Sequence, residues 1–326
     1  MSSASFLVIP QWQGSGSSRA MRLIDGAEAI QGDLPASATH VVAVPPTAGE
    51  TLGSGVLRFS SLNLVRERAA AELALLAPPV VTIGGDCGVD LASVQHAVAA
   101  HPDGTLALVW LDAHGDLNSV STSPSGAFHG MVLRALLGDG PDGLAATGGA
   151  RLDPAQLVLA GTRALDDGET EFVAEAGIHI VEPDDFDDPQ ALVRAVEATG
   201  ATAVYLHIDL DVLDPAAIDG IGYPEPFGVT PERLCDAIRA LRERFELAGA
   251  AVTEFAPESP DAAGRDMPVI LRVLGALTGP LRSGGARAVA AGGAAAEADS
   301  AGVASSSTAG TPRHLSTDTT PPDDAG

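Results

Sequence analysis

The sequence contains no lysine, so arginine supplies all 18 basic residues, against 43 acidic residues and a formal net charge of −25. Nucleic acids and anionic membranes are bound through basic surfaces, so this balance argues against both as partners. An acidic field instead favours cations, which include metal ions and positively charged substrates. Solubility alone also accounts for much of the charge.

Cysteine is scarce, and long apolar runs are missing. Only Cys87 and Cys235 occur in 326 residues, which excludes a disulfide scaffold and predicts a reducing, cytoplasmic location. No run reaches the roughly 18 apolar residues of a membrane-spanning helix. The opening MSSASFLVIPQWQG does not have a basic segment followed by an apolar one, so we expect no signal peptide.

Aromatic residues are absent after position 283, where alanine, glycine, serine, proline and acids prevail. A segment of this kind cannot bury enough apolar surface to offset its ordering entropy. The composition therefore predicts a folded domain over residues 1–282 and a disordered tail over residues 283–326.

The body alternates short apolar runs with helical patterns. SFLVIP, PVVTIGGD, LALVWLDAH and AVYLHIDLDV are apolar throughout, as buried parallel strands are. The helix predicted from TPERLCDAIRALRERFELA begins with Thr230 as its N-cap, followed by Pro231 and Glu232. Repeated βαβ units indicate an α/β fold, with a parallel sheet covered by helices on both faces.

Polar residues follow several of these predicted strands, where ligands bind in parallel sheets. Asp112, His114 and Asp116 occupy alternate positions in WLDAHGD, and Asp209 and Asp211 repeat the spacing in HIDLDV. Residues two apart on a continuing strand point to the same side. A single aspartate here more often caps a turn, but four crowded carboxylates would repel and protonate unless a cation pair neutralised them. Carboxylates with imidazole suit Mn²⁺, with Zn²⁺ and other divalent ions as alternatives.

Three blocks, GGDC, DAHGDLNSVSTSPSGAFHGM and HIDLDVLDP, resemble in order and spacing the signatures of the arginase/agmatinase/formiminoglutamase (ureohydrolase) family. The resemblance implies a three-layer α/β/α domain around an eight-stranded, mainly parallel sheet. It also implies two Mn²⁺ ions bridged by hydroxide. One ion takes Asp112, Asp116 and Asp209, and the other takes Asp112, His114, Asp209 and Asp211.

The remaining ligand of the first ion is normally a histidine after GGD, and here that residue is Cys87. A thiol beside a cation has a lowered pKa and binds as thiolate, which prefers Zn²⁺ or Fe²⁺ to Mn²⁺. The first ion is then held as usual, held weakly or replaced by another metal; alternatively, Cys87 merely fills the space and one ion is weak or absent.

The resemblance also implies the catalytic and substrate-binding residues. His129 matches the residue that passes a proton to the leaving amine, and Glu254 matches the acid that holds the substrate guanidinium. Contacts to the α-carboxylate and α-amino group of an amino-acid substrate fall on Asn118, Ser125, Asp166 and Glu169.

The hypothesis is a hydrolase that cleaves a guanidino C–N bond with a dinuclear-Mn²⁺ site, converting arginine or a close guanidino acid. Ala127 and Tyr223 depart from the family pattern and weaken the case for arginine itself. The alternatives are formiminoglutamase or agmatinase activity, or a catalytically silent binding or assembly subunit. The resemblance further implies a homo-oligomer, a trimer or hexamer.

Overall fold

The computed structural model describes residues 4–281, so the predicted tail over 283–326 lies outside the described residues. Eight strands form one sheet in the order β2-β1-β3-β8-β7-β4-β5-β6, and every pairing is parallel. This confirms the predicted fold class. The strands are β1 (Ser5–Ile9), β2 (Thr39–Val41), β3 (Val80–Gly84), β4 (Leu106–Leu111), β5 (Leu157–Ala160), β6 (His179–Val181), β7 (Ala203–Asp209) and β8 (Glu246–Thr253).

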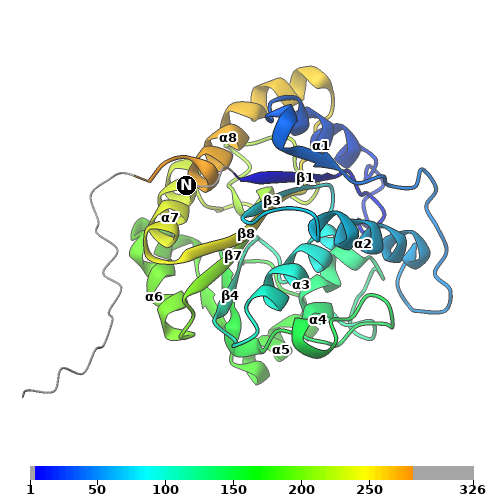
Figure 1. The fold of residues 1–326 in the computed structure, drawn as a ribbon, viewed down its shortest axis with the longest axis horizontal. Coiled ribbons are helices and arrows are strands. Elements are labelled where there is room, and N and C mark those ends of the chain that lie inside the picture. Colours follow the sequence, from blue (N-terminus) through cyan, green and yellow to red (C-terminus); the bar gives the residue numbers. More distant parts are fainter. Residues whose placement is uncertain (1–3, 282–326) are drawn as a thin grey trace, which may run out of the picture. The chain divides into compact units, whose positions relative to one another are not determined.

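Helices cover both faces of the sheet (Figure 1). One layer holds α1 (Arg22–Gly32), α6 (Gln190–Ala198), α7 (Pro231–Arg244) and α8 (Pro260–Thr278). The other holds α2 (Phe59–Leu73), α3 (Asp90–Ala100), α4 (Val132–Leu136) and α5 (Asp167–Ala176). In the described residues, no helix combines the length and apolarity that crossing a membrane requires.

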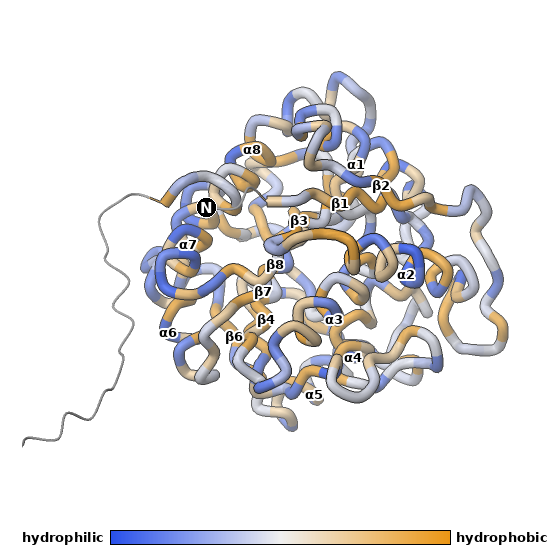
Figure 2. Tube along the Cα trace, in the orientation of Figure 1, coloured by the Kyte–Doolittle hydropathy of each residue, from blue (hydrophilic) through white to orange (hydrophobic). Residues whose placement is uncertain are grey.

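Alternation along the strands builds the two cores. On β7, Val204, Leu206 and Ile208 pack toward the α7 layer, whereas Ala203 and Tyr205 pack toward the α3 layer. Both sets are buried, which explains why the strand sequences are apolar without a polar face. Figure 2 shows hydrophobic colour along the central strands and hydrophilic colour mostly on outer helices and turns.

The predicted helix over 230–248 is confirmed at its start but ends earlier than the pattern suggested. Thr230 accepts a hydrogen bond from the Arg233 N–H as the N-cap, and the helix ends at Arg244. Glu246 then begins β8, because its N–H bonds to the carbonyl of Thr202 at the start of the neighbouring strand. An amphipathic pattern does not reveal this, since the last apolar residues suit a helix or a strand.

Strand order brings four functional segments together. β3, β8, β7 and β4 are consecutive in the sheet, so their carboxyl ends lie side by side. Gly85 lets the chain turn after β3: its N–H bonds to Ile9 O, and its own carbonyl accepts from Glu254 N. A Cβ at Gly85 would lie 1.7 Å from the carbonyl oxygen of Gln11.

We therefore expect Gly85→Ala to destabilise the fold by about 2 kcal/mol or more, because backbone would have to move to relieve the overlap. Gly264→Ala on α8 is the matched control: its Cβ meets nothing within 4 Å, so we expect a gain of about 0.5–1 kcal/mol. Urea unfolding of both variants measures this. Equal effects of the two substitutions would contradict the steric argument.

Candidate metal centre

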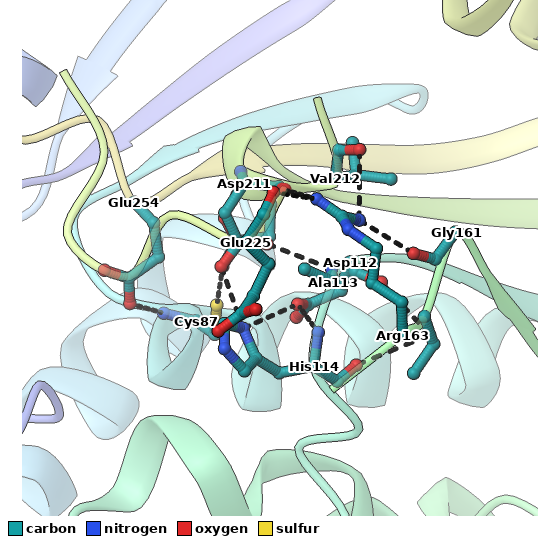
Figure 3. A network of polar contacts seen from close by, with 12 residues as sticks. Cys87, Asp112, Ala113, His114, Gly161, Arg163, Asp211, Val212, Glu225 and Glu254 are labelled. Atoms are coloured by element: carbon teal, nitrogen blue, oxygen red, sulfur yellow. Dashed lines mark hydrogen bonds and ion pairs between the residues drawn. The ribbon is translucent and has the colours of Figure 1, made fainter. Parts of the chain in front are cut away.

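The polar residues predicted at strand ends gather at one point of the sheet edge. Cys87 follows β3, Glu254 follows β8, Asp209 ends β7, and Asp112 follows β4. All four are buried. Figure 3 shows Cys87, Asp211, Asp112 and His114 converging, with Glu254 beside the Cys87 backbone.

Asp112, His114 and Asp116 converge for a different reason from the one predicted. β4 ends at Leu111, so these residues lie on a loop and not on a continuing strand. Carboxylates hold the loop by accepting backbone N–H groups: His114 N bonds to Asp112 Oδ1 at 2.6 Å, and Ala113 N bonds to Asp211 Oδ1 at 3.0 Å. Asp116 has a left-handed φ of 51°, which turns its side chain back toward the others.

The side chains offer three overlapping groups of metal-binding donors within the described residues. In each group, one ligand atom per residue lies within 4.8 Å of all the others. Asp112 belongs to two groups and Cys87 to two, so neighbouring positions share donors. The groups are Cys87, Asp112, Asp116 and His207; Cys87, Asp209 and Glu254; and Asp112, His114 and Asp211.

The proximity of these acids perturbs their titration. Burial, then the charges of neighbouring acids, raises the pKa of Asp116 and Asp209 well above the usual value. Burial and Asp112 raise the pKa of Asp211 to about 6. Burial would lower the pKa of His114, but hydrogen bonds to Asp112 and Asp211 raise it to about 12. The imidazolium therefore supplies compensating positive charge when no metal does.

The donor set fits divalent cations. Asp116 Oδ2 is buried and has no hydrogen-bond partner in the described structure, which is costly for a carboxylate oxygen unless a cation binds it. Oxygen donors with an imidazole are the ligands of Mn²⁺ and similar ions, and cation binding would displace the His114 proton. Because Asp112 belongs to two of the donor groups, these two groups lie side by side.

Cys87 points into this centre. Its Sγ lies 3.2 Å from Asp209 Oδ2, and its N–H donates to Glu254 Oε1 at 3.3 Å. Burial, together with Asp209 and Asp116, raises the pKa of the thiol well above its usual value. A cation reverses this by favouring the thiolate.

His129 and Glu254 form a close pair at the edge of the centre. His129 Nδ1 lies 3.5 Å from Glu254 Oε1. Burial would lower the pKa of His129, but the interaction with Glu254 outweighs it and raises the pKa. Glu254 has a left-handed φ of 64°, a strained conformation for a residue of its size.

A cavity of about 400 Å³ opens beside the donor groups and beside the pair of His129 and Glu254. It is lined by all four residues predicted to bind substrate: Asn118, Ser125, Asp166 and Glu169. Asn118 Nδ2 donates to Asp166 Oδ2 at 2.8 Å. Both Glu169 oxygens accept backbone N–H groups, from Leu117 and Asp166, so this carboxylate also holds the loop.

Tyr223 narrows this cavity. Its ring lies 5.2 Å from the His129 ring and 6.3 Å from the His114 ring, measured between centroids. Ala127, two residues before His129, is buried and presents no polar group. The two departures noted in the sequence therefore fall beside the predicted reacting groups.

Two groups of residues were missed by the sequence analysis. Arg163 donates to the carbonyls of Gly161, Asp211 and Glu225, each at 2.9 Å, which ties the loops around the centre together (Figure 3). His207 belongs to one of the donor groups, and its Nδ1 lies 2.6 Å from Asp90 Oδ2. The sequence does hold a signal for His207, because it precedes Asp209 and Asp211 at the same two-residue spacing.

Comparisons with known proteins agree with this geometry. The sequence matches the Arginase family over residues 31–274. It is 35% identical over 240 residues to an arginase of Bacillus caldovelox, covering 69% of this chain and 79% of that protein. It is 31% identical over 263 residues to an N(omega)-hydroxy-L-arginine amidinohydrolase of Streptomyces lavendulae, covering 80% and 89%.

A solved structure of the Bacillus caldovelox arginase superposes with a TM-score of 0.69 at 27% identity, covering 86% of this chain and 99% of that one. The fold, the donor groups and the sequence similarity thus indicate the same family. The chain belongs to the arginase family, and it is a hydrolase of the class that cleaves C–N bonds in linear amidines and guanidino compounds.

Proposed function

We propose that this protein hydrolyses the guanidino C–N bond of arginine, or of a close guanidino acid, at a dinuclear Mn²⁺ centre. The observation that carries the proposal is the shared position of Asp112 in two donor groups that border a cavity lined by His129 and Glu254. Asp112, Asp116, Asp209 and Cys87 would hold one ion, and Asp112, His114, Asp209 and Asp211 the other. When bound, such a pair supplies hydroxide near neutral pH as the nucleophile.

Glu254 positions the substrate. A carboxylate at this point offers a charge-assisted hydrogen bond to a guanidinium, and the strained backbone of Glu254 fixes its direction. The net charge of −25 favours approach of a cationic substrate. Asn118, Ser125 and Asp166 line the same cavity and are assigned here to an amino-acid head group, which is in line with the names of the two relatives.

His129 supplies the proton that the leaving amine takes up. The guanidino carbon gains an oxygen and becomes tetrahedral, and its collapse requires protonation of the departing amine. Glu254 raises the pKa of His129, which favours the protonated imidazole that this step requires. The products are urea and the amine, ornithine in the case of arginine.

Cys87 supports an alternative metal, and Tyr223 supports an alternative substrate. Sulfur favours Zn²⁺ or Fe²⁺ over Mn²⁺ at one position. Tyr223 reduces the room near His129, which favours a smaller formimino group as a second candidate substrate. Assembly as a trimer or hexamer and a cytoplasmic location stay predictions from the sequence.

The function is tested by assaying purified protein with added Mn²⁺ against L-arginine, Nω-hydroxy-L-arginine, agmatine and N-formimino-L-glutamate. We expect about two ions per chain and urea released from an α-amino acid substrate. Glu254→Gln should abolish release, whereas Glu258→Gln, an exposed surface residue, should not. Two bound ions without urea from any guanidino compound would contradict the proposal and favour formimino chemistry; fewer ions would favour a silent protein.

We expect His129→Asn to lower kcat by about 10²–10⁴, because general acid catalysis contributes that much. The acid form of His129 disappears as pH rises through its raised pKa, so kcat of the natural enzyme should fall on the alkaline side. The variant should lose this alkaline decline, as a pH–rate profile can show. Exposed His40→Asn serves as the control, and an unchanged profile for His129→Asn would refute the role.

We expect the metal-free fold to lose stability as pH rises. The pKa of Asp211 is about 6 in the fold against 3.8 for ordinary aspartate, so its stabilising contribution is complete below pH 3.8 and is lost as pH rises through about 6. In EDTA, Tm should be lower by a few degrees at about pH 8 than at about pH 5. Excess Mn²⁺ should restore Tm at the higher pH. Asp211→Asn should reduce the drop. A Tm that rises over this range would contradict the electrostatic account.

A further inference from the structure

His207 lies directly beneath the donor cluster, on the face of the sheet that carries it. Along β7, Tyr205, His207 and Asp209 point to the α3 side, since alternate residues of a strand share a face. On neighbouring β4, Trp110 pairs in register with His207, and Asp112 follows the end of that strand. This face of β7 thus becomes more polar toward the carboxyl edge of the sheet, and His207 is the last residue on this face before Asp209.

Asp90, the first residue of α3, fixes the orientation of His207. Asp90 Oδ1 accepts the Tyr205 hydroxyl at 2.7 Å, and Asp90 Oδ2 lies 2.6 Å from His207 Nδ1. A carboxylate that accepts on both oxygens places the His207 proton on Nδ1. The ring plane is held as well, because Trp110 stacks on it at 3.4 Å between centroids and 6° between planes.

This tautomer leaves a lone pair on Nε2. Among the described residues, the polar contact of Nε2 is Thr253 Oγ1 at 3.5 Å, a long and weak hydrogen bond. A nitrogen of His207 lies within 4.8 Å of ligand atoms of Cys87, Asp112 and Asp116. With Nδ1 engaged by Asp90, Nε2 is the nitrogen available to that group, which also includes Asp116, whose buried Oδ2 has no hydrogen-bond partner among the described residues.

We propose that His207 Nε2 is a ligand of the metal position formed with Cys87, Asp112 and Asp116, and that Asp90 is its positioning residue. This rests on the metal centre of the proposed function. A metal-binding histidine regularly donates its other N–H to a carboxylate, which is the arrangement of His207 and Asp90. The imidazole that the family resemblance places after GGD, where this chain has Cys87, is thereby supplied from β7.

A purely structural ion pair between His207 and Asp90 is the competing explanation. It accounts for Nδ1 but not for the weakly bonded Nε2 at full burial, where an unsatisfied polar atom is costly. It also leaves the orphaned Asp116 oxygen without a partner. A cation at this position satisfies both atoms at once.

The test compares His207→Gln and Asp90→Asn with the natural chain and with His40→Gln, an exposed histidine on β2. Each protein is stripped with chelator, reloaded with Zn²⁺ or Mn²⁺ and dialysed, and its metal content and affinity are measured. We expect two ions in the natural chain and in His40→Gln, but about one in His207→Gln. Asp90→Asn should retain the ligand and lose about 10–100-fold in affinity for one ion.

X-ray absorption of the Zn²⁺-loaded proteins gives a readout independent of activity. Imidazole scattering should correspond to two histidines per pair of ions in the natural chain, and to one in His207→Gln. Two ions held with unchanged affinity and unchanged scattering in His207→Gln would overturn the inference, while leaving the proposed function intact. A natural chain that binds no metal would overturn both.

Folding is checked on the metal-free proteins by circular dichroism and thermal melting. If His207→Gln does not fold, the metal affinities of Asp90→Asn and Tyr205→Phe test the inference instead. Both variants keep the imidazole and change only the hydrogen bonds that hold it in place. Graded losses of affinity, larger for Asp90→Asn than for Tyr205→Phe, would support the inference. Natural affinity in both would overturn it.

Discussion

The organisation of this protein depends on keeping several ionisable acids close together in a buried place. Asp112, Asp209 and Asp211 approach one another because β4 and β7 are neighbours in a parallel sheet. Their mutual repulsion is tolerated only with positive charge nearby. Protonated His114 supplies some of it, and a pair of divalent cations would supply more. The repulsion among the carboxylates that destabilises the metal-free site also favours the binding of cations there.

Backbone geometry serves this arrangement. Glu254 and Asp116 have left-handed φ values, which cost of order 1–3 kcal/mol each. Neighbouring hydrogen bonds maintain both: Glu254 N donates to Gly85 O, and Asp116 O accepts from Leu133 N. Because the bonds come from separate elements, the strained residues depend on the whole sheet being formed. The fold as a whole, and not one loop, therefore positions these acidic side chains.

The sequence was sufficient for the fold class and for the residues at the strand ends, because apolar runs followed by acids have a direct physical meaning. It was not sufficient for strand order, since nothing local indicates that β8 inserts between β3 and β7. The convergence of Asp112 and Asp116 was predicted for the wrong reason, as the strand stops at Leu111. Arg163 was missed because it acts through backbone carbonyls, which leave no pattern in a sequence.

On the proposed assignment, Cys87 and His207 would change the chemistry of one metal position and not that of the other. Cys87 and His207 bring sulfur and nitrogen to the position that includes Asp116, whereas Asp112, His114 and Asp211 present harder donors to its neighbour. Softer donors favour Zn²⁺ or Fe²⁺, and harder ones favour Mn²⁺. His207 is also held more rigidly than a loop residue, by Asp90 and by the Trp110 stack. On this assignment the two positions would differ in both metal preference and rigidity, because strand β7 fixes one donor of the position that includes Asp116.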